Sequence, residues 1–419
     1  MPAAKSESPD IDDMATAINR LQLSKKRLIE SDKNIKPKGR RMTVGERKLR
    51  IALVGVGFGA EFAPIYNAHP DVEWVALTDT NAEKLAAAGG RFGIDRTYPT
   101  FEAILADPDV DAVHLVTPIP LHAEQAVRVL EAGKHCACTV PMATSFDDIR
   151  RIVAAQRKSG KNYMMMETAA YTREFLMVEE HYKRGEFGEI SFARGSHMQD
   201  MEGWPDYWMG LPPHHYMTHA IAPVLKLLGK RVRKVHCLGS GLLPAERQKR
   251  YGNPFPVETA IFRLEDSPVA VEVTRSLFQT VRPYSEAFSI YGDKLGFEWQ
   301  QIEEEEPLIF SMPQAAFSRG RKIHHEVVSP PDRQDLLPPE IAPFTKRSVF
   351  SDGKHLSFVQ GGGHSGSHPH MVHEFVRSVV EGRAPAIDAI TAANWTAPGI
   401  AAHLSAMADG DAVEVPDFR

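Results

Sequence analysis

Cysteine is scarce in this chain, whose 419 residues include only Cys136, Cys138 and Cys237. So few cysteines, and an odd number of them, cannot form a disulfide framework. Cys136 and Cys138 lie in an apolar run, which favours buried thiols over metal binding or redox chemistry. The sequence also lacks a stretch of about 18 consecutive apolar residues, so no membrane span is expected. Its polar, acidic beginning does not resemble a secretory signal, and we therefore expect a cytoplasmic protein.

An excess of positive charge is missing as well. The chain has 49 lysines and arginines against 54 aspartates and glutamates, which gives a formal net charge of -5. No global basic field therefore argues for nucleic-acid binding. The remaining composition, 43% hydrophobic and 25% charged, is ordinary for a globular protein. The length allows two or three domains with a sizeable core, so we expect neither a nucleic-acid nor a membrane partner.

Residues 1–47 are expected to form an N-terminal extension to the folded part of the chain. After a polar start, residues 12–30 have the spacing of a short amphipathic helix. Its apolar side chains would lie near one face, and they are Met14, Ile18, Leu21 and Leu28. A basic stretch follows. A solvated tail, or a helix that packs on a neighbouring subunit, is favoured over nucleic-acid binding.

Strands and helices alternate from about residue 50. Residues 51–57 form a continuous apolar run, as expected of a parallel strand that is buried on both faces. Further strand patterns at 73–79, 110–118 and 134–141 are separated by helical patterns. This alternation predicts a doubly wound parallel sheet with right-handed crossovers, in an N-terminal Rossmann domain that spans residues 48–170.

After about residue 170 the strand patterns are joined mostly by turns. These strands are expected at residues 190–198, 232–241, 258–265, 269–278, 286–293 and 295–303. They predict a C-terminal α+β domain, residues 171–419, with a large, mostly antiparallel open sheet for substrate binding and oligomerisation. Two helical patterns near the end are expected to pack back on the first domain.

A glycine-rich loop follows the first strand and opens a helix. In the pattern Gly55-x-Gly57-x-x-Ala60, the first glycine permits a tight turn and the second lets the backbone approach a pyrophosphate. Ala60 allows close packing of helix and strand, and the helix N-terminus offers free N–H groups to phosphates. The loop from Gly55 to Ala60, with Phe58 and Gly59 between, therefore predicts a dinucleotide site.

The type of dinucleotide follows from Asp79. This residue ends the second strand, 22 residues after Gly57, where a carboxylate accepts hydrogen bonds from the ribose hydroxyls. Thr80 and Asn81 follow it, so this position has no arginine to neutralise a 2′-phosphate. The sequence therefore predicts NAD as the cofactor rather than NADP.

Three regions resemble one known family. They are GVGFGAEF at residues 55–62, VTPIPLHAEQAVRVLEAGKHCAC at 116–138, and the strands of the second domain. They resemble the glucose–fructose oxidoreductase/inositol dehydrogenase (Gfo/Idh/MocA) family, and the resemblance runs from about residue 49 to the C-terminus. It implies that Thr117, Pro118 and His122 lie beside the nicotinamide end of the cofactor.

The resemblance also places the turn of Thr139 and Pro141 at the cofactor. Taken by itself, His122 is equally compatible with an ordinary residue at the start of a helix. Most dehydrogenases of the family carry Glu-Lys-Pro at this turn, and their lysine acts as general acid/base or holds the substrate hydroxyl. This chain has Thr139-Val140-Pro141, and valine cannot move a proton. The family's aspartate three residues after the catalytic histidine is replaced by Ala222.

A branch of the family lacks the same lysine. Its NAD-dependent glycosidases have Val-Pro at the turn and share a Tyr-x-Thr-His-x-x-x-Pro segment, which this chain matches from Tyr216 to Pro223. Tyr171 is similar to a tyrosine that follows a strand in those enzymes. The resemblance thus implies His219, Tyr171 and Tyr216 as catalytic residues. Glutamate usually precedes Val-Pro in the branch, whereas this chain has Thr139.

The local sequence around His219 supports a site there. Tyr216 and His219 are three residues apart and would share one helical face. Pro223 has no N–H to bond the carbonyl of His219. An unperturbed histidine titrates near pH ~6.5 and is suited to proton transfer. The alternative is a core histidine satisfied by a backbone carbonyl.

Several aromatic and histidine side chains are further candidates for substrate binding. Trp204, Tyr207 and Trp208 could stack on a sugar face or simply pack a loop, and His215 adjoins the Tyr216 segment. His364 lies in a glycine-rich run expected to close over the site before a helix. Metal binding by the histidines of this run is not favoured, because no carboxylate or thiolate partner is evident. We expect no metal site.

These features together predict an NAD-dependent sugar-active enzyme, with the glycosidase chemistry supplied by the resemblance. The sugar would be oxidised transiently at C3, the anomeric group eliminated, water added and the sugar reduced again. His219 would hold or deprotonate the C3 hydroxyl. Tyr171, or alternatively Tyr216, would remove the C2 hydrogen if its phenol pKa were lowered from ~10.

Other functions remain open at this stage. The enzyme could stop after oxidation, as a glycoside or sugar 3-dehydrogenase, or be a polyol dehydrogenase with net NAD reduction. A non-catalytic NAD-binding sensor is a third class. The partner is expected to be a small sugar or glycoside, and the family resemblance implies a homo-oligomer, either dimer or tetramer.

Overall fold

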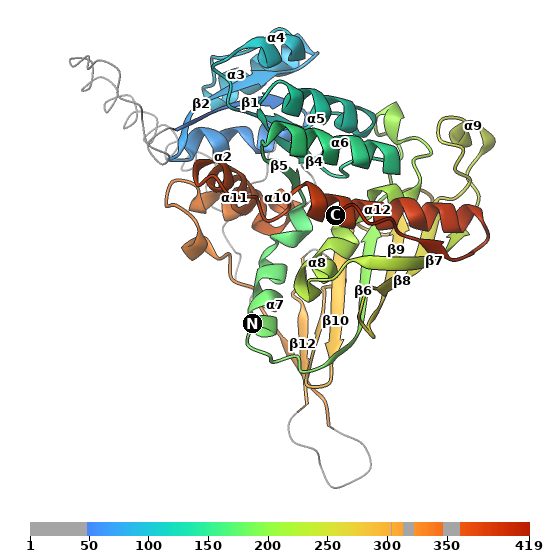
Figure 1. The fold of residues 1–419 in the computed structure, drawn as a ribbon. Coiled ribbons are helices and arrows are strands. Elements are labelled where there is room, and N and C mark those ends of the chain that lie inside the picture. Colours follow the sequence, from blue (N-terminus) through green and yellow to red (C-terminus); the bar gives the residue numbers. More distant parts are fainter. Residues whose placement is uncertain (1–47, 303, 313–321, 347–360) are drawn as a thin grey trace, which may run out of the picture. The chain divides into compact units, whose positions relative to one another are not determined.

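The Rossmann half is built on a parallel sheet whose strand order is β2-β1-β3-β4-β5, five strands in the part of the chain that the structure describes (Figure 1). All its neighbouring strands pair in parallel. The strands are β1 Leu49–Val54, β2 Val72–Thr78, β3 Ala112–Leu115, β4 His135–Thr139 and β5 Tyr163–Met166. Since β3 and β5 are buried along their whole length, the prediction of a doubly wound sheet covered on both faces is confirmed.

The structure is a computed structural model that describes residues 48–302, 304–312, 322–346 and 361–419. The extension predicted for residues 1–47 lies outside these ranges. Residues 47–419 belong to one compact unit, so the division at residue 170 stays a prediction. Within the described ranges, none of the helices has the length and apolar character needed to cross a membrane.

Short helices connect the parallel strands. They are η1 Phe58–Glu61, α2 Ala63–Ala68, α3 Ala82–Phe92, α4 Phe101–Ala106, η2 Ile119–Leu121, α5 His122–Glu131 and α6 Phe146–Ser159. Their ends follow capping chemistry. Ser145 accepts a hydrogen bond from the Asp148 amide at the start of α6, and Gly160 ends the helix in a left-handed conformation.

The second sheet has nine strands among the described residues, in the order β13-β12-β11-β10-β6-β9-β8-β7-β14. The strands are β6 Ile190–Met198, β7 Val232–Ser240, β8 Val257–Leu264, β9 Ala270–Ser276, β10 Ser285–Gly292, β11 Leu295–Glu298, β12 Leu308–Ser311, β13 His324–Val327 and β14 Val413–Glu414. Only β6 and β9, among these described pairs, run parallel. The prediction of a mostly antiparallel sheet is therefore confirmed.

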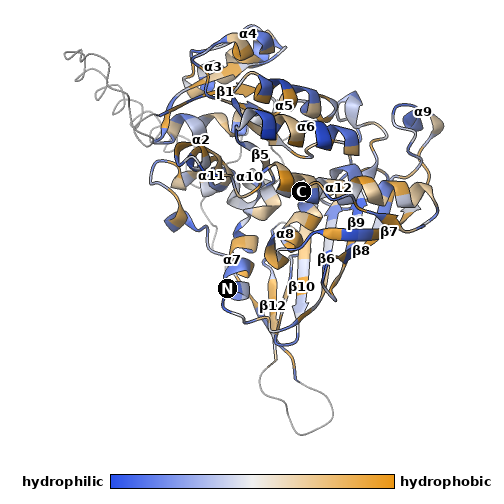
Figure 2. Ribbon diagram, viewed as in Figure 1, coloured by the Kyte–Doolittle hydropathy of each residue, from blue (hydrophilic) through white to orange (hydrophobic). Residues whose placement is uncertain are grey.

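One face of this sheet is covered by helices. Burial alternates strictly along β8, and Figure 2 shows hydrophobic and hydrophilic residues mixed along the strands. The elements around the sheet are η3 Thr168–Ala170, α7 Arg173–Lys183, η4 Asp206–Trp208, η5 Pro213–Tyr216, α8 Thr218–Leu228, α9 Ala245–Gln248, η6 Gln334–Leu336, η7 Ala342–Thr345, α10 Gly361–Gly366, α11 His368–Val380 and α12 Ala389–Met407. The long α12 contacts both β7 and β5, so it lies against both sheets.

Helix α8 reaches the second sheet at an unusually short distance. It packs on β6 and β10, and a Cβ atom at Gly195 of β6 would lie 2.1 Å from the carbonyl oxygen of Ala220 in α8. Only glycine permits this approach. The first turn of α8, which carries His219, is thereby pressed against the sheet.

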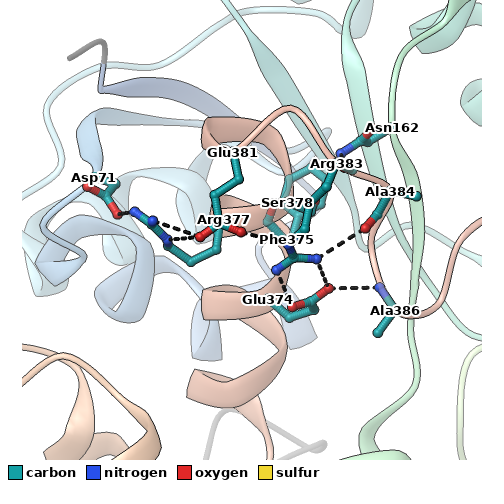
Figure 3. Close-up of polar contacts among 10 residues, drawn as sticks. All are labelled: Asp71, Asn162, Glu374, Phe375, Arg377, Ser378, Glu381, Arg383, Ala384 and Ala386. Carbon is teal, nitrogen blue, oxygen red and sulfur yellow. Dashed lines mark hydrogen bonds and ion pairs between the residues drawn. The ribbon is translucent and has the colours of Figure 1, made fainter. Parts of the chain in front are cut away.

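Helix α11 is anchored to the Rossmann half by polar contacts (Figure 3). Arg377 donates to Asp71 at 2.8 Å, and Asn162 donates to the Ser378 hydroxyl at 3.0 Å and to the Arg383 carbonyl at 2.9 Å. These contacts fix the C-terminal part of α11 beside the first sheet. The turn that precedes α11 is consequently held near the glycine-rich loop.

Replacement of Gly55 by alanine should destabilise the protein by roughly 1–3 kcal/mol, because the position combines a strained backbone with a steric clash. Gly55 has φ +90° and a Cβ there would lie 2.4 Å from the Val116 carbonyl oxygen. The matched control is Gly90→Ala in the exposed part of α3, where a Cβ meets nothing within 4 Å; it should stabilise by roughly 0.5–1 kcal/mol. Urea unfolding measures both changes, and equal stabilities for the two variants would contradict the assigned strain.

Candidate active site

The glycine-rich loop has the shape that a dinucleotide pyrophosphate requires. Gly55 turns the chain in the left-handed region, and a Cβ at Gly57 would face open space within 4 Å, so no side chain blocks the loop there. Asp79 is fixed beside it, since its carboxylate accepts hydrogen bonds from the amides of Val56 and Asn81, both at 2.8 Å. A bare loop with an adjacent oriented carboxylate fits the phosphates and ribose of NAD.

His122 lies at the first turn of α5 and is almost fully buried. Its Nδ1 is 2.8 Å from the Pro141 carbonyl oxygen and its Nε2 is 2.8 Å from the Thr117 carbonyl oxygen. Burial lowers the pKa of His122, and the two carbonyl contacts oppose this shift. Both ring nitrogens thus face protein oxygens, and His122 lies between the Thr117 turn and the Thr139–Pro141 turn. Its contact with a cofactor stays a prediction.

The predicted histidine of α8 forms a buried pair with a carboxylate. His219 Nδ1 is 2.5 Å from Glu167 Oε1 and 3.2 Å from the Thr168 hydroxyl. Glu167 follows the end of β5 and is fully buried. Since a carboxylate only accepts hydrogen bonds, Nδ1 carries the proton and Nε2 is left as an acceptor. Nε2 is 3.4 Å from the Tyr216 hydroxyl, so the structure brings the predicted Tyr216 and His219 together.

A second carboxylate, that of Glu286 in β10, lies near the same ring nitrogen of His219. Its Oε2 is 3.6 Å from His219 Nδ1 and accepts a hydrogen bond from the Tyr284 hydroxyl at 2.8 Å. Its Oε1 accepts from His364 Nδ1, also at 2.8 Å. The rings of His364 and His219 stack, with centroids 5.7 Å apart and planes inclined by 27°. The structure therefore places the predicted His364 within the His219 cluster.

Glu286 and His364 each stabilise the charged form of the other. Burial alone would raise the pKa of Glu286, but the neighbouring His364 and His219 hold it at about 2. Burial alone would lower the pKa of His364, but the carboxylate of Glu286 raises it to about 9. At neutral pH the pair is therefore ionised in the protein interior.

Arg275 of β9 fixes the turn that carries Tyr216. Its fully buried guanidinium donates to the carbonyl oxygens of Tyr216 at 2.9 Å and of His197 at 3.0 Å, and to the Gln199 side chain at 3.0 Å. Burial lowers the pKa of Arg275 to about 9. The His197 ring lies edge-on to His219 with centroids 5.1 Å apart. Neither His197 nitrogen has a hydrogen-bond partner among the described residues.

Tyr171 lies apart from this cluster. No hydrogen bond or ring contact joins it to His219 among the described residues; the Lys226 ammonium instead lies 4.1 Å from its ring centroid. Lys226 donates to the Ala170 carbonyl at 2.7 Å. Burial raises the pKa of the Tyr171 phenol above its usual range. Tyr171 therefore lacks the lowered phenol pKa that a base would need. Burial also raises the phenol pKa of Tyr216.

The predicted aromatic residues pack on one another beside Tyr216. The Trp208 ring lies edge-on to that of Tyr216, with centroids 4.8 Å apart. The rings of Tyr207 and Trp204 also contact Trp208, with centroids 5.4 Å and 6.3 Å from it. With Ile119 of η2, they belong to a small core separate from the main one. This geometry shows that the rings pack a loop, and stacking on a sugar stays a prediction.

His215 points into a different buried group. Its ring lies 5.2 Å from that of His403, edge-on, and His403 Nδ1 contacts Glu258 Oε1 at 2.6 Å. The His214 amide donates to the other oxygen of Glu258 at 2.9 Å. His215 is thus not part of the His219 cluster. The described residues contain no group of three or more potential metal ligands arranged to hold an ion.

Sequence reasoning missed the carboxylates Glu167 and Glu286. Glu167 had a usable signal, because it follows the end of a parallel strand, where ligand sites of such sheets occur. Glu286, Tyr284 and Arg275 had none. They lie in or next to strands of an antiparallel sheet, in which alternate residues of ordinary polar character face solvent.

Comparison with known proteins identifies the class to which this fold and loop belong. Residues 49–167 match the model of the oxidoreductase family with the NAD-binding Rossmann fold, Gfo/Idh/MocA. This match and the relatives below confirm the predicted resemblance to this family. The prediction of NAD as cofactor is confirmed with it.

Two relatives cover almost the whole chain. A glycosyl hydrolase family 109 protein of Streptomyces niveus is 26% identical, over 93% of this chain and 82% of its own length. A glycosyl hydrolase family 109 protein of Bacteroides fragilis is 23% identical, over 93% of this chain and 90% of its own length. Levoglucosan dehydrogenase in complex with NADH and levoglucosan has the same fold, with a TM-score of 0.68 and 21% identity. That similarity covers 88% of this chain and all of the dehydrogenase.

Replacement of Glu286 by glutamine should remove a pH-dependent stabilisation of about 2 kcal/mol. The low pKa of Glu286 stabilises the fold above its unfolded value of about 4.5. The high pKa of His364 stabilises the fold below about 6.5, and this contribution is lost as the pH rises through about 9. The loss in Glu286→Gln should therefore be largest near pH 5–6 and shrink above pH 9. Urea unfolding across this range measures it, and a loss that grows with pH would rule out the ion pair.

Proposed function

We propose that this protein is an NAD-dependent enzyme that acts on a sugar or glycoside, and specifically a glycosidase with a redox mechanism. The observation that carries the proposal is the buried Glu167–His219 pair next to the end of β5. It presents an unprotonated imidazole nitrogen in a fold that binds NAD. Relatives named as family 109 glycosyl hydrolases, similar over 93% of the chain, support the glycosidic substrate.

The cofactor would be held by the residues already expected to contact it. These are Gly55, Gly57, Phe58, Gly59, Ala60, Asp79, Thr117, Pro118, Thr139 and Pro141. His122 would act through its two carbonyl contacts, by keeping the Thr117 and Pro141 turns together. Bound NAD supplies a hydride acceptor that takes hydrogen from C3 of the sugar and later returns it.

His219 is the base for the C3 hydroxyl. Its Nε2 accepts the hydroxyl proton, because Nδ1 already donates to Glu167. The carboxylate of Glu167 then stabilises the imidazolium and keeps the ring in place. Arg275 holds the Tyr216 carbonyl at 2.9 Å, so the Tyr216 hydroxyl stays beside the same nitrogen.

Of the two tyrosines, Tyr216 is the one placed to remove the C2 hydrogen, and it would do so against a phenol pKa that burial raises. Its hydroxyl is 3.4 Å from His219 Nε2, whereas Tyr171 contacts Lys226 instead. The Arg275 guanidinium, 5.4 Å from the Tyr216 ring centroid, stabilises a phenolate there and partly offsets the effect of burial on the phenol pKa.

Two other functions give different products. A sugar or polyol dehydrogenase would use the same His219 base and accumulate reduced cofactor. Thr139, which lacks a carboxylate at the turn, and the fold shared with levoglucosan dehydrogenase make this the second candidate. A sensor without catalysis has no use for a buried base, so the His219 pair argues against it.

Incubation of aryl glycosides with the enzyme and NAD in deuterium oxide tests the proposal. Release of phenol together with deuterium at C2 is expected, because elimination requires removal of the C2 hydrogen. Accumulation of reduced cofactor without phenol would assign a dehydrogenase. Cleavage without label at C2 would refute the redox mechanism.

Replacement of His219 by glutamine should lower kcat by about 10²–10⁴-fold through loss of the base. The affinity for NAD, measured by isothermal titration, should stay unchanged because His219 contacts none of the loop residues. His325→Gln is the matched control, as His325 is exposed on β13; its kcat should equal that of the wild type. An undiminished kcat in His219→Gln would eliminate this residue as the base.

A further inference from the structure

The last three residues of α10, immediately before α11, form a strained turn. His364, Ser365 and Gly366 have φ angles of +46°, +52° and +78°, so two residues with side chains adopt the left-handed region in succession. This region is disfavoured for residues that carry a Cβ atom. Such a conformation persists only where the surroundings enforce it, and it is concentrated at functional sites.

Neighbouring elements clamp this turn. Arg173 of α7 donates to the Ser365 carbonyl at 3.3 Å and to the Thr345 carbonyl at 3.4 Å, and it pairs with Asp332 at 3.1 Å. A Cβ atom at Gly366 would lie 2.5 Å from the Thr345 carbonyl oxygen, so the turn also fits closely against η7. The position of the His364 side chain is therefore imposed by the fold.

In this position the His364 side chain lies between the glycine-rich loop and the first turn of α8. The His364 ring is 5.8 Å from that of Phe58 in the glycine-rich loop and 5.7 Å from that of His219. Its Nδ1 is committed to Glu286. None of the described residues forms a hydrogen bond with His364 Nε2, and the side chain keeps 11% exposure. Nε2 is thus the atom that can reach a ligand.

Two parallel histidine–carboxylate pairs result. Glu167 holds His219 through Nδ1 at 2.5 Å, and Glu286 holds His364 through Nδ1 at 2.8 Å. His364 faces the carboxylate of Glu286 with the Tyr284 hydroxyl 3.4 Å from its Nδ1, and its pKa of about 9 keeps Nε2 protonated at neutral pH. In His219, Nδ1 contacts Glu167, so Nε2 is the nitrogen placed to accept a proton. A proton donor and a proton acceptor held side by side are suited to act as acid and base.

We propose that His364, held by Glu286 and stacked beside His219, is the proton donor to the glycosidic oxygen that leaves the sugar. The assignment rests on the proposed redox glycosidase. Val140 has no proton to give, and the carboxylates of Glu167 and Glu286 are occupied by histidines. His364 supplies an acidic N–H at the same cluster.

The electrons and protons of the step balance. After oxidation at C3, the C2–H bond breaks, its proton goes to the base and its electron pair forms the C1=C2 double bond. The C1–O bond breaks with its pair on the leaving oxygen, which takes the proton of His364 Nε2. Water then adds to C1 and returns a proton to His364, while C2 regains its hydrogen. His364 is charged again at the end of the cycle.

The substitution His364→Asn separates proton donation from structure. Asparagine tolerates the left-handed region better than most residues, and its amide can still donate to Glu286. Its other atoms cannot protonate a leaving group. The phenyl glycoside needs such a proton because phenolate is a poor leaving group, whereas the 2,4-dinitrophenyl glycoside does not.

For His364→Asn we expect release of phenol to fall about 10²–10³-fold, and release of dinitrophenol to fall less than about threefold. Deuterium exchange at C2 of the phenyl glycoside should continue at close to the wild-type rate, since oxidation and C2–H removal do not use His364. Glu286→Gln should show the same dependence on the leaving group and serves as the second variant. His325→Asn, at an exposed position, should leave both rates unchanged.

Equal losses on the two glycosides would overturn the assignment, because a merely structural role does not distinguish leaving groups. Loss of C2 exchange in His364→Asn would overturn it as well, by placing the residue in an earlier step. A wild-type enzyme that reduces NAD but releases no aglycone would instead refute the glycosidase itself, and the proton donor with it. The two kinds of failure are therefore distinguishable.

Discussion

The buried hydrogen bond between Glu167 and His219 joins the parallel sheet to the helix that covers the second sheet. Glu167 follows the last strand of the parallel sheet, and His219 lies in the first turn of the helix that covers the second sheet. A carboxylate buried without a partner would cost several kcal/mol, so the two halves are held in the register that satisfies it. The orientation of the His219 ring, and its position beside the Tyr216 hydroxyl, depend on this contact.

A second constraint reaches the site from the C-terminal region. Helix α11 is tied to the Rossmann half through Arg377 and Asn162, and the turn before it is clamped by Arg173. His364 is consequently placed against Glu286 of the second sheet. Interior charge is tolerated here because the carboxylates of Glu167 and Glu286 contact the imidazoles of His219 and His364. Residues from four separate parts of the chain thus share one polar cluster within an apolar core.

The sequence was most informative where function depends on local backbone chemistry. The turn at Gly55 could be predicted because strand, turn and helix follow one another directly in the chain, and Asp79, at the end of the next strand, does lie beside it. That these residues hold NAD stays a prediction. The Tyr216–His219 spacing could likewise be predicted, because these two residues are close in the chain. The catalytic role of Tyr171 was implied only by the family resemblance, and in the structure the Tyr171 ring contacts the Lys226 ammonium. Glu286 and Arg275 could not be predicted as site residues. In the sequence they are ordinary polar residues of strands, and only the folded sheet brings them to the face that the helices cover.

The close contact at Gly195 has a consequence for how this protein can change. That glycine touches no ligand, yet the peptide of Ala220, next to His219, rests directly on it. Any side chain at this point would lift the helix from the sheet and move His219 away from Glu167. Glycine is otherwise a poor choice within a strand, yet this position accepts no larger residue without a shift of α8. The separation of the histidine and its carboxylate is therefore set by a residue that contacts neither of them.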